Sequence, residues 1–348
     1  MGYAYVGCRT TRERNARGKG IKVFRIDEVT GDWTEIQCLL VEDNPSYQAM
    51  DRHGKYLYSV HGDISKISSY KILDDGTLRH LNTVDIGGRN PVYLTVDKTD
   101  RYLIVAALQG GAVYSLRLKE DGSIGGIADT VRFEGKKDGA VSFVHQCAWD
   151  CDGEYIFAPA QGRIQGYGQI RVFKFHGENG SFEETCKVLA REFAEPRHIA
   201  MHPNNKYVYL MNEKDNTVEY LEFCKETGQL YPRQILPTLP DTYVGEGQAS
   251  TAAVDASGSI LVGANRTFDT LVLYRINPHT GYLKTIGFMP TLGKTPRFMG
   301  FNREATRLYV ANEDSDTIVE MKLDVEKGYV EYTGRIIATE SPVCIVFK

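Results

Sequence analysis

Short apolar runs separated by turn residues recur along the chain, and they predict β-strands paired as hairpins. The stretch EPRHIAMHPNNKYVYLMNE, residues 195–213, shows the pattern in full. The side chains of its second run alternate in kind, as the two faces of a strand require, and the polar segment HPNNK favours a turn. In an antiparallel hairpin the start of one strand lies beside the end of the other. We therefore expect Arg197 and Glu213 to be neighbours.

This hairpin is one copy of a repeating unit with a spacing of roughly 46 to 53 residues. The other copies begin at Asn44, Asn90, Phe143, Gly247, Thr295 and Ser341. Each complete copy is followed by a third strand such as GQIRVFKF, a turn such as GENGSF, and a fourth, more polar strand. Four antiparallel strands per repeat at this spacing are typical of a β-propeller blade.

The two ends of the chain complete the count of blades. AYVGCRT, GIKVFRID and WTEIQCLLV near the N-terminus supply the second, third and fourth strands of a blade, and the C-terminal PVCIVFK supplies its missing first strand. Joining them gives seven blades and closes the ring, which removes exposed sheet edges. The sequence thus predicts an all-β, seven-bladed propeller that forms a single domain over residues 1–348.

Composition and charge narrow the classes of partner. The 348 residues are 42% hydrophobic and 25% charged, with a formal net charge of −4 and no basic block, so we expect no nucleic-acid partner. No apolar run approaches the length of a membrane span, and the N-terminus lacks the apolar core of a signal peptide. The seven cysteines lack the spacing of a zinc site, so free thiols and a cytoplasmic location are expected.

Hairpin geometry also sorts the candidate functional residues, because the starts of first strands and the ends of second strands lie on one face of the disc. Four consecutive blades direct a histidine, a carboxylate and three arginines to this face, and we take these as the candidate site: His145, Arg197, Glu213, Arg266 and Arg297. Neighbouring polar residues are expected to help bind substrate: His198, Asn212, Asn265 and Asn312. Arginine forks bind carboxylate or phosphate, an arginine can stabilise an oxyanion, and a histidine or glutamate can move a proton.

The motifs VHQCAWDCDGEYIFAP, PRHIAMHPNNKYVYLMNE, ANRTFDTLVLYRI and TPRFMGFNREATRLYVANE resemble the seven-bladed propeller lactonase family over essentially the whole chain. That family includes propeller-type 6-phosphogluconolactonases and carboxy-cis,cis-muconate cyclases. The resemblance implies an active site of His145, Arg197, Glu213 and Arg266, with Arg297 as a further motif arginine. The chain departs from the family at Tyr93, which replaces a histidine, and in an enlarged loop over residues 163–169.

Four functions are compatible with these residues. We expect metal-independent, cofactor-free hydrolysis of a small anionic sugar lactone, with Glu213 or His145 as general base and Arg197 or Arg266 at the oxyanion. The second is lactonising cyclisation of a carboxylated muconate by the same residues. A non-catalytic interaction platform is the third, although the WD-repeat signature is absent. The fourth is a metal-dependent lactonase, which three arginines at one point would oppose by repelling a cation.

Overall fold

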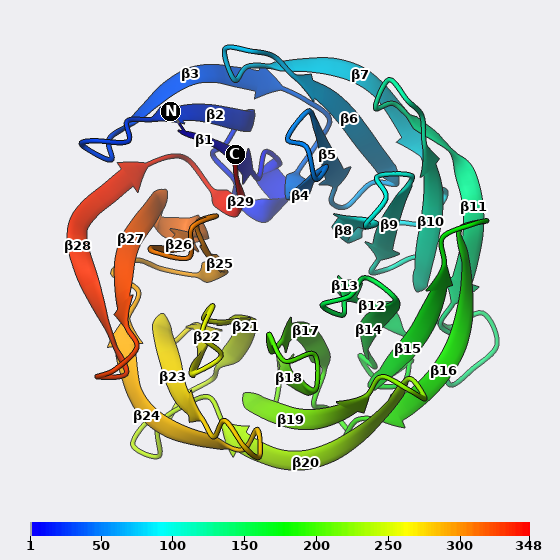
Figure 1. Ribbon diagram of the computed structural model, residues 1–348, viewed down its shortest axis with the longest axis vertical. Helices are drawn as coiled ribbons and strands as arrows, with labels where there is room; N and C mark the ends of the chain where they lie inside the picture. The colour runs from blue at the N-terminus through cyan, green and yellow to red at the C-terminus, as the bar shows by residue number, and fades with distance from the viewer. Residues whose placement is uncertain (1) are drawn as a thin grey trace.

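The repeats fold into seven antiparallel sheets arranged as the blades of a ring (Figure 1). The coordinates are a computed structural model that describes residues 2–348. We number the blades from the first complete repeat, so that blade seven is the one that joins the two chain ends. The predicted all-β, seven-bladed propeller is confirmed.

The strands follow the chain from the innermost to the outermost position of each blade. Blades one and two contain β4 (Pro45–Met50), β5 (Tyr56–His61), β6 (Lys66–Ile72) and β7 (Leu78–Asp85), then β8 (Pro91–Val96), β9 (Tyr102–Ala107), β10 (Ala112–Leu118) and β11 (Ile124–Arg132). Blade three contains β12 (Phe143–Val144), β13 (Ala148–Trp149), β14 (Tyr155–Gln161), β15 (Gln169–His176) and β16 (Ser181–Leu189). Its fifth strand arises because the inner strand is divided into β12 and β13.

The remaining blades repeat this order. Blades four and five contain β17 (Pro196–Met201), β18 (Tyr207–Asn212), β19 (Thr217–Cys224) and β20 (Gln229–Pro237), then β21 (Gln248–Val254), β22 (Ile260–Arg266), β23 (Thr270–Ile276) and β24 (Leu283–Pro290). Blade six contains β25 (Pro296–Phe301), β26 (Leu308–Asn312), β27 (Thr317–Asp324) and β28 (Tyr329–Ala338). Blade seven contains β29 (Pro342–Phe347), β1 (Gly2–Cys8), β2 (Gly20–Ile26) and β3 (Trp33–Leu40).

Blade seven closes the ring as the sequence predicts. The C-terminal strand β29 pairs antiparallel with β1, and Tyr5 lies opposite Val346. Figure 1 shows both chain ends within this one blade. The closure gives blade seven four strands, as in the other blades.

The hydrophobic core is divided among the interfaces between blades. There are seven clusters of buried apolar residues, and each draws its side chains from two neighbouring blades. Second strands such as β9, with the sequence YLIVAA, are buried along their whole length because both faces of the sheet are covered. Fourth strands such as β7, with the sequence LRHLNTVD, lie at the rim and are mostly half-buried or exposed.

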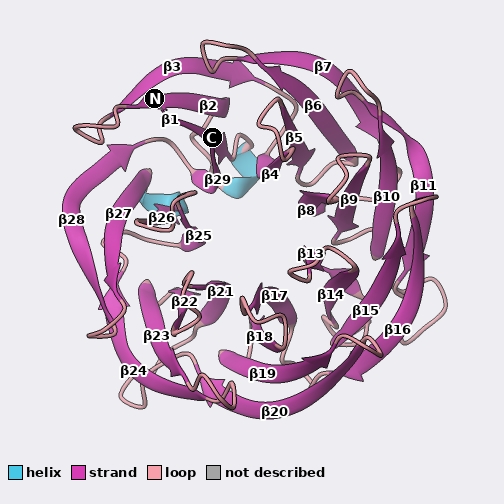
Figure 2. Cartoon of the chain, in the orientation of Figure 1, coloured by secondary structure: helices cyan, strands magenta, loops and turns pink. Residues whose placement is uncertain are grey.

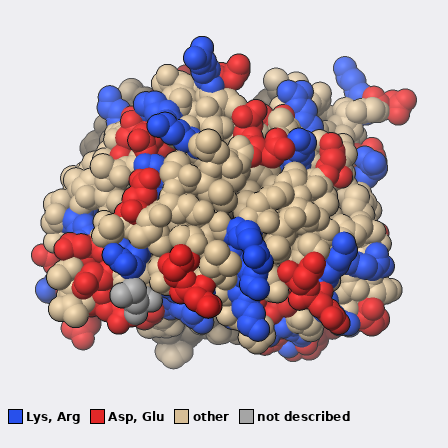
Figure 3. Space-filling view, turned by 90° about the horizontal axis from the view of Figure 1, so that it is seen from above, with Lys and Arg blue, Asp and Glu red and all other residues tan. Residues whose placement is uncertain are grey.

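The remaining features concern the helices, the surface charge, membrane spans and the cysteines. Two short 3-10 turns, η1 (Arg12–Arg14) and η2 (Glu313–Ser315), are the helical segments drawn in Figure 2. On the edge of the disc seen in Figure 3, acidic and basic side chains are interspersed. Among residues 2–348, no helix is long and apolar enough to cross a membrane. All seven cysteines are free.

Candidate active site

Each inner hairpin contains one extra residue close to the face that carries the candidate residues. Such a β-bulge re-aims a side chain that would otherwise follow the pleat of the strand. Single extra residues occur at Ser46, Val92, Arg197, Arg297 and Val343. In blade three, residues 145–147 lie opposite 158–159, and in blade five 250–251 lie opposite 264. The bulge is therefore a repeated device that directs one side chain per blade towards the central channel.

His145 reaches the channel because the inner strand of blade three is interrupted. The backbone N–H of His145 donates to the carbonyl of Pro159 at 3.0 Å. In a hydrogen-bonded antiparallel pair, the backbone N–H at position 159 would also donate to the carbonyl of His145, but Pro159 has no N–H. The ladder consequently breaks between β12 and β13, and His145 lies in the gap.

Arg197, Glu213 and Arg266 form a buried ion cluster that we call the first triad. Arg197 Nε lies 3.1 Å from Glu213 Oε2, and Arg266 Nη2 lies 3.3 Å from Glu213 Oε1. The Arg197–Glu213 contact confirms the pairing expected from the hairpin. Because all three side chains are buried, this pair differs from an exposed surface ion pair.

Neighbouring blades hold the first triad in place. Gln161 Nε2 donates to Glu213 Oε2 at 3.0 Å, and Arg163 Nε donates to Gln161 Oε1 at 2.8 Å. Arg197 Nη1 donates to the backbone carbonyl of Ser250 in blade five. The carboxylate and the guanidinium are thus fixed from both sides.

The arginines keep Glu213 ionised. Burial by itself would raise the pKa of Glu213, but the charges of Arg266 and Arg197 and the bond from Gln161 outweigh burial. The resulting pKa of Glu213 is about 2. At neutral pH this group is a carboxylate with little affinity for a proton.

His145 is held neutral beside this cluster. Burial lowers the pKa of His145 well below 6.5, and the positive charges of Arg197 and Arg297 lower it further. Its Nδ1 is buried and makes no hydrogen bond, and its ring packs edge-on against His198 with centroids 5.2 Å apart. A neutral imidazole with a free nitrogen can accept a proton.

A second cluster of the same composition lies next to the first, and two of its members, Arg9 and Glu313, were not predicted. Arg297 Nη1 lies 3.5 Å from Glu313 Oε2, and Arg9 Nε lies 2.9 Å from Glu313 Oε1. We call Arg297, Glu313 and Arg9 the second triad. The signal for the two missed residues was present in the repeat, since ANE and GCR end the second strands of blades six and seven just as MNE and ANR end those of blades four and five.

Two hollows adjoin the triads. A cavity of about 30 Å³ in the channel is lined by His145, Arg197, Arg297 and Arg9 among others, and it has room for one or two water molecules. A larger hollow of about 580 Å³, lined in part by Glu213, opens beside it and falls within the range of about 300–1,000 Å³ typical of ligand pockets. The Arg197–Glu213 pair contributes to the walls of both.

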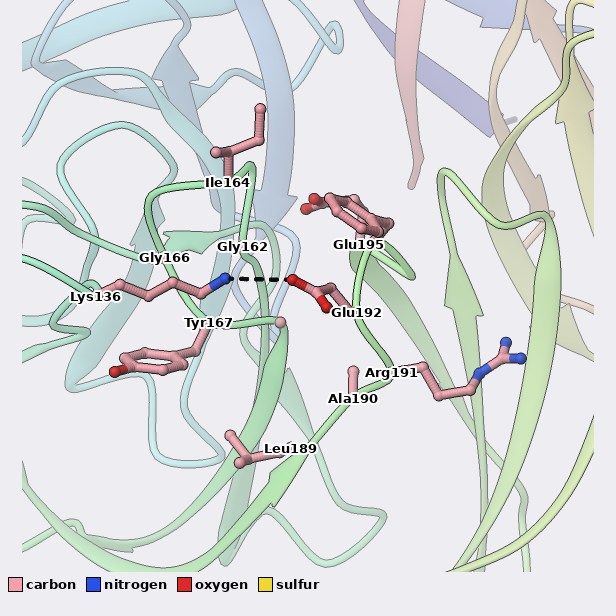
Figure 4. A pocket seen from close by; sticks show the side chains of 12 residues that line it. Lys136, Gly162, Ile164, Gly166, Tyr167, Leu189, Ala190, Arg191, Glu192 and Glu195 are labelled. Atoms are coloured by element: carbon pink, nitrogen blue, oxygen red, sulfur yellow. Dashed lines mark ion pairs between the residues drawn. The ribbon is translucent and has the colours of Figure 1, made fainter.

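The enlarged loop of blade three borders the larger hollow. The loop spans residues 162–168, and Ile164 at its tip and Phe193 on the next connection are both exposed. Ile164 adopts a left-handed φ of 74°, which is strained for a β-branched residue and is a kind of strain found at ligand sites. Figure 4 shows the pocket on the outer side of this loop, where Lys136 Nζ and Glu192 Oε1 lie 3.9 Å apart.

Aromatic rings close the channel beneath the cavity. Tyr47 and Phe298 line both this cavity and a hollow that extends to the turn of β4 and β5 on the opposite face. Tyr93, the departure from the family pattern, stacks on Tyr47 with centroids 4.1 Å apart and meets His198 edge-on at 6.0 Å. His198 also contacts Thr251 through Nδ1 at 3.2 Å. His198 therefore belongs to a layer that separates the two ends of the channel.

The three predicted asparagines are turned elsewhere, and all are fully buried. Asn212 donates to Glu219 at 2.9 Å in the next strand of its own blade, whereas Asn265 and Asn312 donate to the carbonyls of Thr238 at 2.6 Å and Thr291 at 3.0 Å. These bonds link strand ends to neighbouring segments. Among the described residues, no group of three or more His, Cys, Asp or Glu side chains is placed to hold a metal ion.

Comparison with known proteins shows which family model the chain matches. Residues 3–347 match the family model described as lactonase, 7-bladed beta-propeller. The 6-phosphogluconolactonase of Bacillus subtilis is 26% identical over 349 residues, covering 99% of this chain and 97% of the relative. The 6-phosphogluconolactonase of Formosa agariphila is 28% identical over 343 residues, covering 90% and 91%. The periplasmic gluconolactonase of Pseudomonas aeruginosa shares the fold, with a TM-score of 0.88 at 24% identity and coverage of 100% and 99%.

Proposed function

The chain belongs to the seven-bladed β-propeller lactonase family, and from that membership we propose that it hydrolyses a small anionic sugar lactone of the 6-phosphogluconolactone type. The observation that supports this most directly is the placement of a neutral His145 beside the first triad, in a cavity large enough for water. Arginines next to a proton acceptor are what attack of water on an ester carbonyl requires.

We assign the proton transfers to His145. Water attacks the lactone carbonyl carbon and forms a new C–O bond, while one of its protons passes to the imidazole of His145. The carbonyl oxygen becomes the oxyanion of the tetrahedral intermediate. Collapse of the intermediate breaks the ring C–O bond, and the imidazolium returns its proton to the ring oxygen. The product is a hydroxy acid.

Arg197 and Arg266 stabilise the oxyanion in this proposal, and Glu213 aligns them. A carboxylate with a pKa of about 2 is a weak base, so Glu213 suits the second task better than proton abstraction. Its two oxygens contact one arginine each, and this fixes both guanidinium groups before substrate arrives. Preorganised charge of this kind is a large source of rate enhancement.

Cyclisation of a carboxylated muconate is supported less well. That reaction was expected to use His145 or Glu213 as proton donor. With the pKa values of both groups below neutrality, each is deprotonated at pH 7 and cannot donate. Hydrolysis needs a proton acceptor first, which His145 provides.

A substrate panel tests the proposal. Phosphorylated, carboxylated and neutral sugar lactones, together with a carboxylated muconate, would be incubated with the protein and with His145→Ala. We expect acid release from the phosphorylated lactone well above the spontaneous rate, and loss of that excess in His145→Ala. Equal rates for the two proteins would reject His145 as the base, and equal rates with and without protein would reject the lactonase function.

A further inference from the structure

The propeller repeat places charged residues at the same position in four consecutive blades. The residue that comes directly after Asn212, Asn265, Asn312 and Cys8 at the ends of the second strands is Glu213, Arg266, Glu313 and Arg9 in blades four to seven, so its charge alternates. Each glutamate pairs with a bulge arginine of its own blade and with the strand-end arginine of the next blade. The second triad is therefore a copy of the first made by the same two repeat positions.

The two triads together carry an excess of positive charge. Their four arginines and two glutamates sum to +4 − 2 = +2. Asp63 lies 3.9 Å from Arg9 but is also bound by Arg14, and Glu195, which acts on Glu213, is balanced by Arg163, so these two pairs add no net charge. Buried charge without a counter-charge is costly, so an excess of this size favours a bound anion.

Unused donors point to the same conclusion, and both triads have them: Arg197 Nε, Arg266 Nε and Arg266 Nη2 in the first, and two nitrogens of Arg9 in the second. Arg9 is buried, yet its Nε and Nη1 make no hydrogen bond of normal geometry despite the short Nε–Glu313 distance. Buried donors in proteins nearly always have partners. Burial and the neighbouring Arg297 also lower the pKa of Arg9 to about 9, as expected where positive charges crowd. An acceptor-rich ligand would satisfy both the donors and the charge.

We propose that the second triad is the subsite that binds the doubly charged anionic group of the substrate, a phosphate monoester. This inference rests on the lactonase function proposed above and deepens it. A phosphate monoester carries a charge of about −1.5 to −2 at pH 7, close to the combined excess of the two adjacent triads, whereas a single carboxylate would offset only half of that combined excess. Its oxygens match the planar forks of arginine.

The subsite is accessible and lies close enough to the first triad to serve one substrate. The side chain of Arg297 is 23% exposed, so the second triad is open to solvent at this residue. Arg9, Arg297 and Arg197 line one cavity, and the charges of Arg297 and Glu313 act on Arg266. The two triads are therefore neighbours, as a single substrate that contacts both would require.

Binding of inorganic phosphate tests the subsite without turnover. Calorimetric titration should show that Arg9→Gln and Arg297→Gln each weaken phosphate binding by about 10- to 100-fold, the size of one charge-assisted hydrogen bond. Arg297→Lys keeps the charge but loses the fork and should fall between the wild type and Arg297→Gln. The matched control is Arg191→Gln, because Arg191 is exposed, pairs with Asp215 and points away from the loop of Ile164 in Figure 4. Phosphate affinity retained in the Arg9 and Arg297 variants, or lost equally in Arg191→Gln, would overturn the proposal.

Kinetics separate the subsite from the lactonase function itself. The ratio of kcat/KM for a phosphorylated lactone to that for its unphosphorylated counterpart should fall at least tenfold in Arg9→Gln and Arg297→Gln. An unchanged ratio in both variants would place the phosphate elsewhere. A wild type that hydrolyses neither lactone would reject the proposed function, and the phosphate titration would still decide the anion site.

Discussion

The two triads have the same composition and occupy the same repeat positions, but their surroundings differ. In the first, the side chain of Arg197 is 3% exposed, and Gln161 and His145 lie beside the cluster. In the second, the side chain of Arg297 is 23% exposed, and the preceding blade five carries Ser250 and Thr251 where blade three carries His145. The repeat therefore supplies two sets of cationic groups, and burial together with a single histidine suits one of them to chemistry.

Burial changes what the same charges can do. Ion interactions are stronger where water is excluded, so the first triad can stabilise a charge that develops during reaction. The more open second triad can exchange an anion with solvent without burying it permanently. A propeller that duplicates one motif can thus separate catalysis from binding through a difference in exposure and one neighbouring histidine.

The largest expected effect distinguishes the triads by kinetics. Arg197→Met should lower kcat about 100- to 1,000-fold, because it removes a donor from the developing oxyanion. Arg297→Met should act mainly on KM for a phosphorylated lactone. Steady-state kinetics on both variants, with circular dichroism to verify folding, provide the comparison. Equal losses of kcat in the two variants would mean that the triads share one role.

Stability should separate the triads next. Glu213→Gln leaves two buried arginines without their carboxylate and should lower the free energy of unfolding by about 3–5 kcal/mol. Glu313→Gln should cost less, about 1–3 kcal/mol, because Arg297 can turn towards water. Urea denaturation in phosphate-free buffer measures both. A larger loss for Glu313→Gln would show that exposure is not what distinguishes the clusters.

Much of this architecture could be predicted from the sequence because it repeats. The strand order, the closure by β29 and the Arg197–Glu213 contact follow from hairpin periodicity. The bulges could not be predicted in this way, because one extra residue in a hairpin leaves no clear mark in an alternating pattern. The effect of Pro159 on the inner strand of blade three was likewise visible only once the pairing of the two strands was known.

The positions of the candidate residues could be predicted in part for the same reason. Residues chosen by their place in the hairpin do reach one face, but the direction of a side chain at a strand end depends on its partners. The asparagines bond to neighbouring segments, which the face alone could not indicate. Arg9 and Glu313 stand out only when the same repeat position is compared across all seven blades, because a single motif shows no more than a charged strand end.

The pH dependence should reveal electrostatic coupling between the triads. His145 accepts a proton only when neutral, and its pKa lies below 6.5, so kcat/KM should be level at pH 7 and fall as the pH drops through that pKa. Glu213, with a pKa of about 2, should not contribute above pH 4. In Arg297→Gln the pH at which kcat/KM falls should rise towards 6.5, because the positive charge of Arg297, which opposes protonation of His145, is gone.

An unphosphorylated lactone is the proper substrate for this profile, since a phosphate monoester has its own ionisation near pH 6. A fall in kcat/KM that begins above pH 7 in the wild type would assign proton abstraction to another group. If kcat/KM of Arg297→Gln falls at a lower pH than that of the wild type, the second triad does not act on His145 through its charge.

Ionic strength provides the smallest and most selective contrast. Raising salt from about 0.05 to about 0.5 M shortens the screening length to a few ångströms, which weakens exposed charge interactions more than buried ones. KM for a phosphorylated lactone should therefore rise several-fold, because its phosphate must reach the partly exposed Arg297. Turnover at saturating substrate should stay within about twofold, because the first triad is shielded from the added ions.

Sodium chloride and sodium sulfate at equal ionic strength make an internal control. Sulfate, a divalent tetrahedral anion, should raise KM further by competing for the second triad. A fall in kcat that parallels the rise in KM would mean that salt reaches both triads, and that the difference in burial between them does not divide their roles.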